Sequence, residues 1–195
     1  MRVIIASSNK GKIREYSQLL LPLGYEVISA KDAGVDIDVE ETGSTFAENS
    51  ALKARAIYAL CHECVLADDS GLCVDALDGA PGIYSARFGG LDTDEARCHL
   101  LLEKLKGIPD EKRTAHFVCT IHFIYADGRE VAVEGRVNGM IAHSPSGDNG
   151  FGYDPVFLYN GISFADVGSD VKNEVSHRAN ALKALLRELE KGENK

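Results

Sequence analysis

Apolar residues follow two periods along this chain, and the two periods predict alternating strands and helices. Strands are expected where apolar residues form short runs or alternate with polar ones. They cover residues 2–7, 25–29, 65–67, 114–125, 130–137, 139–142 and 156–159. Helices are expected where apolar residues recur every three or four positions, in stretches that begin near residues 12, 45, 92 and 176. Residues 75–90 are rich in turn formers, and we do not expect them to be regular.

Residues 114–125 carry the strictest alternation. One face of the predicted strand holds Ala115, Phe117, Cys119, Ile121, Phe123 and Tyr125. The other face holds His116, Thr120 and His122, and we interpret the two histidines as outward-facing strand residues rather than ligands. Asp127-Gly128 follows as a turn dipeptide.

Two adjacent carboxylates, Asp68 and Asp69, directly follow the apolar run at 65–67. Side chains alternate faces along a strand, so both acids can serve one site only if the strand ends or twists there, which Gly71 permits. Carboxylates at the C-terminal edge of a strand suit a hard cation such as Mg²⁺, and open α/β sheets bind ligands at that edge. The alternative is an Asp-Asp-Ser-Gly turn capped by its own side chains.

The loop Ser7–Lys12 lies between the first predicted strand and helix. It does not match a Walker A loop, because Ala6 stands at the first glycine position and Ile13 at the Ser/Thr position. Small residues at a helix N-terminus still expose backbone N–H groups, and two lysines add charge, so the loop predicts an anion site. The alternative is a polar loop with solvated lysines.

Thr45–Glu48 matches a capping box and predicts a helix to about residue 60. Asn49 and Lys53 share one face of that helix. They form either a surface pair or an amide and an ammonium directed at the same anion as the first loop. Glu40 and Glu41 lie just before the helix, as a solvated acidic loop or as the source of a third carboxylate for the metal site.

The segment 146–155 combines three glycines with two aromatic residues. Aromatic rings beside glycines can stack on a flat ligand, and the alternative is a wide turn with Phe151 in the core.

Ser176 is a natural N-cap, which places His177 and Arg178 in the first turn of the last helix. Cations oppose the helix dipole there, which indicates either a nearby anion or polar ligand, or a surface position.

Composition disfavours several partners. Lys+Arg number 21 against 30 Asp+Glu, and a net charge of −9 disfavours long nucleic acids and anionic membranes but allows a small phosphorylated ligand. No apolar run approaches the ~18–20 residues of a membrane span, and the N-terminal apolar run is too short for a signal peptide.

Five scattered cysteines indicate a reduced, cytoplasmic setting, and Cys61–Cys64 lacks the second pair that a zinc site needs. The length predicts a single domain over residues 1–195.

Seven motifs, in order along nearly the whole chain, resemble those of the inosine triphosphatase (Ham1-like) family of non-canonical purine nucleoside triphosphate pyrophosphatases. They are Ser7–Lys12, Glu40–Asn49, Lys53–Ala56, Ala67–Gly71, Gly79–Phe88, Gly150–Pro155 and Ser176–Arg178. Each motif is weak alone, and seven in order are specific.

The resemblance implies an α/β fold with an elongated mixed β-sheet flanked by helices, in two lobes with a central cleft. It also implies a homodimer, Mg²⁺ as cofactor, and hydrolysis of ITP, dITP and XTP to the monophosphate and pyrophosphate. It assigns Asp69 as proton acceptor, and Glu40 and Asp69 to the metal. The substrate residues are Ser7, Ser8, Asn9, Lys10, Gly11, Lys12, Lys53, Ser70, Phe151, Gly152, Tyr153, Asp154, Lys172, His177 and Arg178.

Two other functions stay open. One is a related pyrophosphatase that acts on modified pyrimidine or methylated nucleotides, and the other is a module that binds ITP and changes partners without hydrolysis. The clustered carboxylates disfavour the second, because a pure anion binder gains nothing from acids near phosphates. Donors such as Arg178 would pair with the 6-oxo group of hypoxanthine or xanthine and oppose the 6-amino group of adenine.

Overall fold

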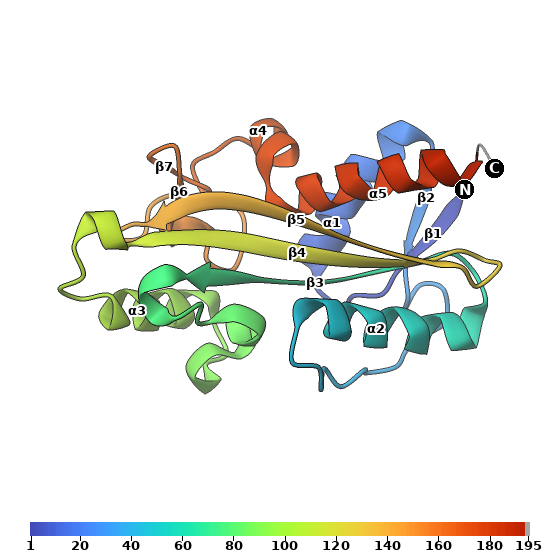
Figure 1. Ribbon diagram of the computed structural model, residues 1–195, viewed down its shortest axis with the longest axis horizontal. Helices are drawn as coiled ribbons and strands as arrows, with labels where there is room; N and C mark the ends of the chain where they lie inside the picture. The colour runs from blue at the N-terminus through green and yellow to red at the C-terminus, as the bar shows by residue number, and fades with distance from the viewer. Residues whose placement is uncertain (194–195) are drawn as a thin grey trace. The chain divides into compact units, whose positions relative to one another are not determined.

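The computed structural model describes residues 1–193, which form one mixed sheet with helices on its faces (Figure 1). The strands are β1 Arg2–Ile5, β2 Glu26–Ser29, β3 Val65–Val74, β4 Thr114–Ile124, β5 Glu130–Ile141, β6 Phe157–Tyr159 and β7 Ile162–Ser163. The helices are α1 Lys10–Leu20, α2 Phe46–Cys61, α3 Asp94–Lys104, α4 Ser169–Val175 and α5 His177–Glu193. The strand order is β2-β1-β3-β4-β5-β6-β7. β1 pairs in parallel with β2 and β3, and β6 pairs antiparallel with β5 and β7, so the predicted mixed α/β sheet is confirmed.

The described chain divides into two compact units, each with its own core. Unit 1 contains Met1–Asp69, Cys119–Gly135 and the chain from Arg178 onward. Unit 2 contains Ser70–Val118 and Arg136–His177. The boundary falls inside β3, β4 and β5, and in β3 it separates two neighbouring residues of the predicted site, Asp69 and Ser70.

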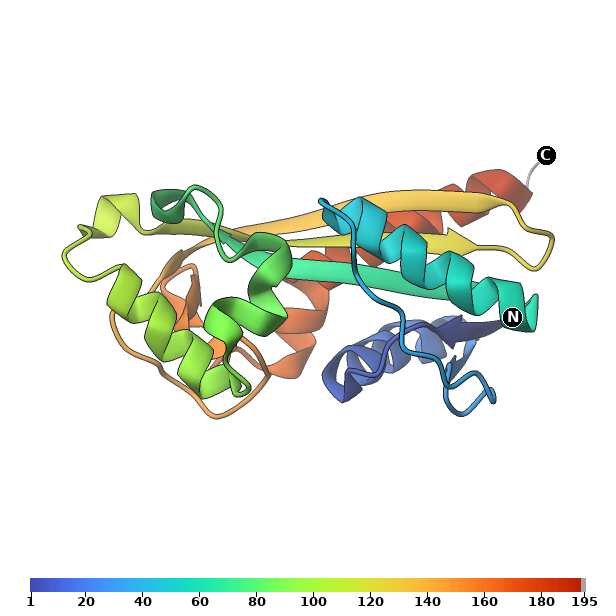
Figure 2. The same ribbon diagram turned by 90° about the horizontal axis from the view of Figure 1, so that it is seen from below.

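In unit 1, alternate side chains of β1 and β3 enter two different cores. Ile5 and Leu66 pack with apolar residues of α1 and α5. Ile4, Val65 and Ala67 pack with apolar residues of α2. The two ribbon views agree that α5 and α2 lie on opposite faces of these strands (Figures 1 and 2). The direction of any β3 side chain is therefore fixed by its parity along the strand.

Unit 2 has a core of aliphatic and aromatic residues. Leu72 of β3 and Leu101 of α3 belong to it, together with Phe117 and Phe157, whose ring centroids lie 4.6 Å apart. The 3₁₀ segment Gly82–Gly90 lies beside α3 (Figure 2). Most of the stretch from residue 75 to 90 consists of such short turns, as its composition predicts.

The start of α2 confirms the predicted capping box, except that the Glu48 side chain binds the N–H of Ser44 instead of the N–H of Thr45. The side-chain oxygen of Thr45 accepts a hydrogen bond from the N–H of Glu48 at 3.1 Å. Glu48 Oε2 accepts from the N–H of Ser44 at 2.6 Å, one residue before the N-cap. Capping therefore engages Glu48 and removes it from the candidate site residues.

Two strand predictions are wrong. The central strand does not end at Asp68 but continues to Val74. Residues 130–141 form one strand, β5, which runs through Gly139 without a break. Glycine is required there because a Cβ would overlap the backbone oxygen of Leu158 on β6. The short elements β7 and α4 have no periodic signal and were not predicted.

His122 does not face outward as predicted. Its side chain is buried, and its Nε2 lies 2.8 Å from Glu130 Oε2. Glu130 also accepts hydrogen bonds from two nitrogens of Arg55, so side chains of α2 and β5 cover His122 on this face of β4. His116 is half-buried, 4.0 Å from Asp75.

Candidate functional site

Asp68 lies inside β3 on the face that packs against α1 and α5. It is 1% exposed, and its Oδ2 lies 2.9 Å from Lys12 Nζ and 3.7 Å from Arg178 Nε. Arg178 also pairs with Glu15 of α1 inside the same cluster. Burial alone would raise the pKa of Asp68, but the charges of Lys12, Arg178 and Lys53 lower it well below its usual range. Asp68 is therefore a charged anchor for two cations.

Asp69 points to the opposite face, toward α2. Its Oδ2 accepts a hydrogen bond from Asn49 Nδ2 at 3.0 Å, and its Oδ1 lies 3.9 Å from Lys53 Nζ. Burial raises the pKa of Asp69, Lys53 opposes the rise, and the nearby Glu41 adds to it, so the pKa ends above its usual value. A buried carboxylate with a raised pKa is a candidate proton acceptor.

Lys53 links the acids on this face. Its Nζ donates to Glu41 Oε1 at 2.5 Å and is only partly exposed. Burial would lower the pKa of Lys53, but Asp68, Asp69 and Glu41 outweigh that effect and raise it. Of the two interpretations of the Asn49 and Lys53 pair, the surface pair is therefore wrong, because both residues contact buried acids.

Carboxylate oxygens such as those near Lys53 are the kind of ligand that a hard divalent cation prefers. The buried Oδ1 of Asp68 has no hydrogen-bond donor within residues 1–193, and Asp69 and Glu41 supply further carboxylates around Lys53. In the same part of the chain, no three His, Cys, Asp or Glu side chains already form a ligand set. Mg²⁺ needs only one or two carboxylates when waters and phosphates complete its shell. Glu40, the predicted ligand, is exposed, while the neighbouring Glu41 contacts the cluster; nothing in its spacing distinguishes it from Glu40.

The loop Ser7–Lys12 forms the predicted helix N-terminus. Asn9 is the N-cap of α1, and its Oδ1 accepts from the N–H of Lys12 at 3.1 Å. Ser7 Oγ accepts from the N–H of Asn9 at 3.2 Å. Ser8, Asn9 and Lys10 are exposed, Ser7 and Gly11 are half-buried, and Lys12 turns inward to Asp68. The alternative of two solvated lysines is therefore wrong for Lys12.

In unit 2, the predicted residues of the aromatic loop and Lys172 form one cluster. Asp154 Oδ2 accepts from the N–H of Phe151 at 2.9 Å and from Lys172 Nζ at 2.7 Å. Lys172, on α4, also lies 5.2 Å from the centroid of the Phe151 ring. Phe151 is half-buried, and Tyr153 enters the core instead, donating its hydroxyl to the backbone oxygen of Ser85 at 3.0 Å. The alternative with Phe151 in the core is therefore wrong.

The first two residues of α5 are both buried. The His177 ring stacks on Phe117 in unit 2, with centroids 4.7 Å apart and planes 15° apart. Arg178, in unit 1, is 2% exposed between Glu15 and Asp68. The surface alternative for these two cations is therefore wrong. Ser70, the remaining predicted residue, is half-buried on β3.

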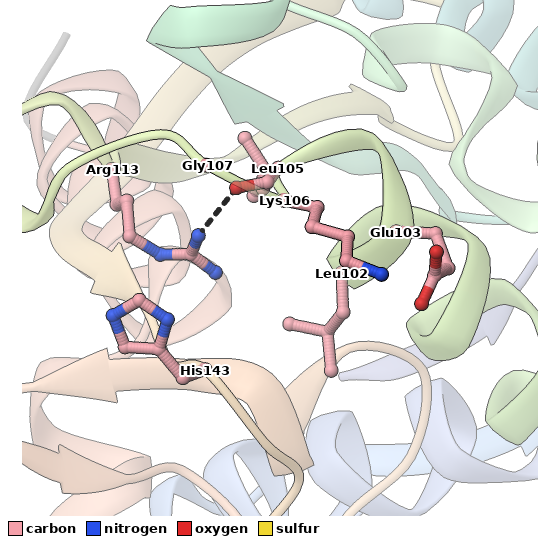
Figure 3. Close-up of a pocket in the computed structure, with 7 residues that line it drawn as sticks. All are labelled: Leu102, Glu103, Leu105, Lys106, Gly107, Arg113 and His143. Carbon is pink, nitrogen blue, oxygen red and sulfur yellow. Dashed lines mark hydrogen bonds between the residues drawn. The ribbon is translucent and has the colours of Figure 1, made fainter.

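A separate hollow of about 260 Å³ lies in unit 2, and none of the predicted site residues lines it (Figure 3). Its lining is Leu102, Glu103, Leu105, Lys106, Gly107, Arg113 and His143. The buried guanidinium of Arg113 donates to the backbone oxygens of Leu105, Ile141 and Ala142 at 2.9, 2.9 and 2.7 Å. Arg113 therefore joins the end of α3 to the end of β5, which is a structural role.

The segment Cys61–Cys64 closes α2. His62 is its C-cap in the left-handed region, with φ 51°, and its ring meets Tyr58 edge to face. All five cysteines of the chain are free thiols. No helix within residues 1–193 is both long enough and apolar enough to span a membrane.

A mixed sheet that carries buried strand carboxylates, inward lysines and a capped helix N-terminus is typical of enzymes that act on phosphorylated ligands. Comparison with known proteins identifies the family. The Ham1 family model matches residues 3–188, and the chain belongs to this family.

Relatives cover nearly the whole chain. A protein of Exiguobacterium sp. named dITP/XTP pyrophosphatase is 49% identical over 97% of this chain and 97% of its own length. One of the same name from Listeria monocytogenes is 45% identical over 96% of this chain and 94% of its own. The solved Ham1 protein of Staphylococcus aureus matches with a TM-score of 0.86 and 42% identity, over 98% of this chain and 100% of that one.

Proposed function

We propose that this protein hydrolyses non-canonical purine nucleoside triphosphates (dITP, XTP and ITP) to the monophosphate and pyrophosphate. The observation that carries the proposal is the contrast between two neighbouring carboxylates. Asp68 is held charged by Lys12 and Arg178, whereas Asp69 is buried with a raised pKa. The family and the printed names of the relatives support the substrate class.

The loop Ser7–Lys12 is proposed to bind the phosphates. The N-terminus of α1 presents backbone N–H groups, and the exposed ammonium of Lys10 adds a positive charge. Lys12 and Lys53 are oriented by Asp68 and Glu41, so little reorganisation is required when an anion binds. Phosphoryl transfer depends chiefly on such positioning and charge stabilisation.

Asp69 is proposed to accept the proton of the water that attacks the α-phosphorus. A carboxylate of raised pKa is a stronger base than an ordinary one, and the hydrogen bond from Asn49 fixes its orientation. Asp69, with Glu41 or the predicted Glu40, would hold Mg²⁺. Bound there, Mg²⁺ would polarise the phosphate and stabilise pyrophosphate as leaving group.

The segment Phe151–Asp154 is proposed to contact the purine base. Its half-buried Phe151 ring offers a flat surface for stacking, and Lys172 and Asp154 hold that residue in place. Arg178 remains the proposed donor for the 6-oxo group. In unit 1 its guanidinium pairs with Glu15 and Asp68, which fixes its position.

Pyrophosphate release tests this function. We expect release from dITP, XTP and ITP in Mg²⁺, much less from ATP, and none after chelation. Asp69→Asn should lower kcat by about 10²–10⁴-fold, as expected for loss of a general base. Asp127→Asn, which changes an exposed turn carboxylate of unit 1, is the matched control and should behave like the wild type.

Other outcomes would support the two other functions. Preference for modified pyrimidine nucleotides in the same panel would favour the related pyrophosphatase. Binding of ITP without pyrophosphate release would favour the sensing module. Near-normal turnover of Asp69→Asn would remove Asp69 from the role of base.

The proposal includes a homodimer in the cytoplasm. The five free thiols are in keeping with a reducing compartment. Sedimentation equilibrium at micromolar concentration, which separates a 21.1 kDa monomer from a particle of twice that mass, tests the oligomeric state.

A further inference from the structure

Two residues near the N-terminal end of α3 hold both backbone polar groups of Gly152 in the aromatic loop. Asp94 Oδ2 accepts a hydrogen bond from the N–H of Gly152 at 2.6 Å. Cys98 lies four residues later, on the same side of the helix, and its Sγ donates to the backbone oxygen of Gly152 at 3.4 Å. Burial raises the pKa of Cys98 to about 12, so the thiol keeps the proton that it donates.

Arg97 fixes the carboxylate that performs this contact. Its Nη2 pairs with Asp94 Oδ1, and its Nη1 donates to the backbone oxygen of Leu91 at 2.6 Å. Arg97 itself is 9% exposed. Asp94 is therefore bound on one side by a buried guanidinium and on the other by Gly152, which leaves its carboxylate a single well-defined position.

Helix α3 has an N-cap and a first-turn acid besides Asp94. Thr93 is already the N-cap, and its Oγ1 accepts from the N–H of Ala96 at 3.2 Å. Glu95 supplies a second first-turn carboxylate, and the Oε1 of its exposed side chain lies 3.8 Å from His99 Nε2. Asp94 is the first-turn acid whose carboxylate reaches the loop as well as Arg97 of α3.

Gly152 is the residue through which this contact reaches the ring of Phe151. Its φ of 64° lies in the left-handed region, where no side chain is accommodated easily. The neighbours on both sides are also fixed, Phe151 N–H by Asp154 and the Tyr153 hydroxyl by Ser85. Asp94 holds the N–H of the peptide that joins Phe151 to Gly152, so its contact lies next to the residue that carries the ring.

We propose that Asp94 is a positioning residue for the aromatic loop: it fixes the Gly152 peptide and thereby the ring of Phe151. This inference rests on the proposed function in one respect, the assignment of Phe151 to the purine base. Asp94 lies outside the motifs that resemble the family pattern, and it is separated from Gly152 by 58 positions in the sequence.

The test compares Asp94→Ala with Glu95→Ala. Both variants remove one first-turn carboxylate from α3. Only the first removes the contact to Gly152, and with it the carboxylate partner of Arg97. We expect Asp94→Ala to raise KM for dITP about tenfold, as for one lost charged hydrogen bond, with kcat within about threefold. Asp94→Asn, which keeps one acceptor oxygen, should fall between the wild type and Asp94→Ala.

Inorganic tripolyphosphate, which has no base, separates positioning from general damage. Its inhibition constant should stay within about twofold in Asp94→Ala, because the proposed phosphate residues Ser7–Lys12 belong to unit 1. A parallel rise of KM for dITP and of this inhibition constant would overturn the proposal. Equal KM values for Asp94→Ala and Glu95→Ala would do the same.

Hydrogen exchange keeps the inference independent of catalysis. The Gly152 amide should exchange at least about tenfold faster in Asp94→Ala than in Glu95→Ala. If the wild type released no pyrophosphate from any nucleotide, the proposed function would fail, while this exchange ratio would still decide whether Asp94 fixes the loop. An unchanged ratio would overturn the positioning role even in an active enzyme.

Discussion

Replacing the two neighbouring carboxylates of β3 one at a time is expected to separate stability from activity. Asp68→Asn leaves Lys12 and Arg178 in a buried cluster without the charge that lies 2.9 and 3.7 Å from them. Removing one partner of a buried ion pair typically costs about 3–5 kcal/mol. Lys12 is partly exposed and Arg178 keeps Glu15, so we expect a loss near the lower end, about 3 kcal/mol.

Asp69→Asn is expected to change the free energy of unfolding by less than about 1 kcal/mol. Its folded-state pKa is raised, so its ionisation works against folding. The contribution of Asp69 to stability is present below its unfolded pKa, about 3.9, and is lost as the pH rises through the folded pKa. An uncharged amide at neutral pH therefore removes an unfavourable charge while Asn49 keeps a hydrogen-bond partner.

The opposite sign holds for Asp68, whose folded-state pKa is lowered. Its contribution is present above the unfolded pKa of about 3.9 and is lost as the pH falls through the folded value. Urea unfolding at pH 7, 4 and 3 measures both effects. The difference between wild type and Asp68→Asn should be largest at pH 7 and shrink at pH 3.

Equal destabilisation by the two substitutions would refute this reasoning, because it would mean that the two faces of β3 do not differ electrostatically. So would a stability loss in Asp68→Asn that does not depend on pH. The loss of turnover in Asp69→Asn must occur in a variant that unfolds at the wild-type urea concentration.

Further predictions concern the charges around Asp69 and the structural role of Arg113. The pH profile of kcat/KM for dITP should rise with pH through an apparent pKa above the usual aspartate value, because the proposed base is the deprotonated Asp69 and its pKa is raised. Lys53→Met should move that profile to higher pH, since it removes the cation that opposes the rise. Chelation should abolish pyrophosphate release, and added Mg²⁺ should restore it. Arg113→Ala should lower the free energy of unfolding by about 2–4 kcal/mol, measured in urea, because three backbone oxygens lose their donor, with KM for dITP unchanged.

Local patterns were sufficient for most of the fold. Alternation over 114–125 predicted β4, and the odd positions from Ala115 to Phe123 do line the cores. The capping box at Thr45 predicted the start of α2. These signals act within a few residues, so a single sequence contains them completely.

The end of β3 was not predictable in the same way. Two aspartates in succession disfavour a strand, and the partners that stabilise Asp68 there come from α1 and α5, more than a hundred residues apart. The burial of His122 has the same origin, because Arg55 and Glu130 lie on other elements. Contacts of this kind depend on the tertiary structure and have no local pattern.

Asp68 and Asp69 are neighbours on β3, and this position gives two identical side chains pKa values shifted in opposite directions. Because the period of a strand is two, Asp68 and Asp69 must leave it on opposite faces. On one face the cations Lys12 and Arg178 hold the first carboxylate charged, and on the other burial and Glu41 raise the pKa of the second despite Lys53. A slip of the strand by one residue would exchange the two environments and leave the base in the ion-paired position. The parallel pairing of Ile4 with Val65 and of Ile5 with Leu66 fixes that register, so the packing of β1 against β3 determines which aspartate can accept a proton.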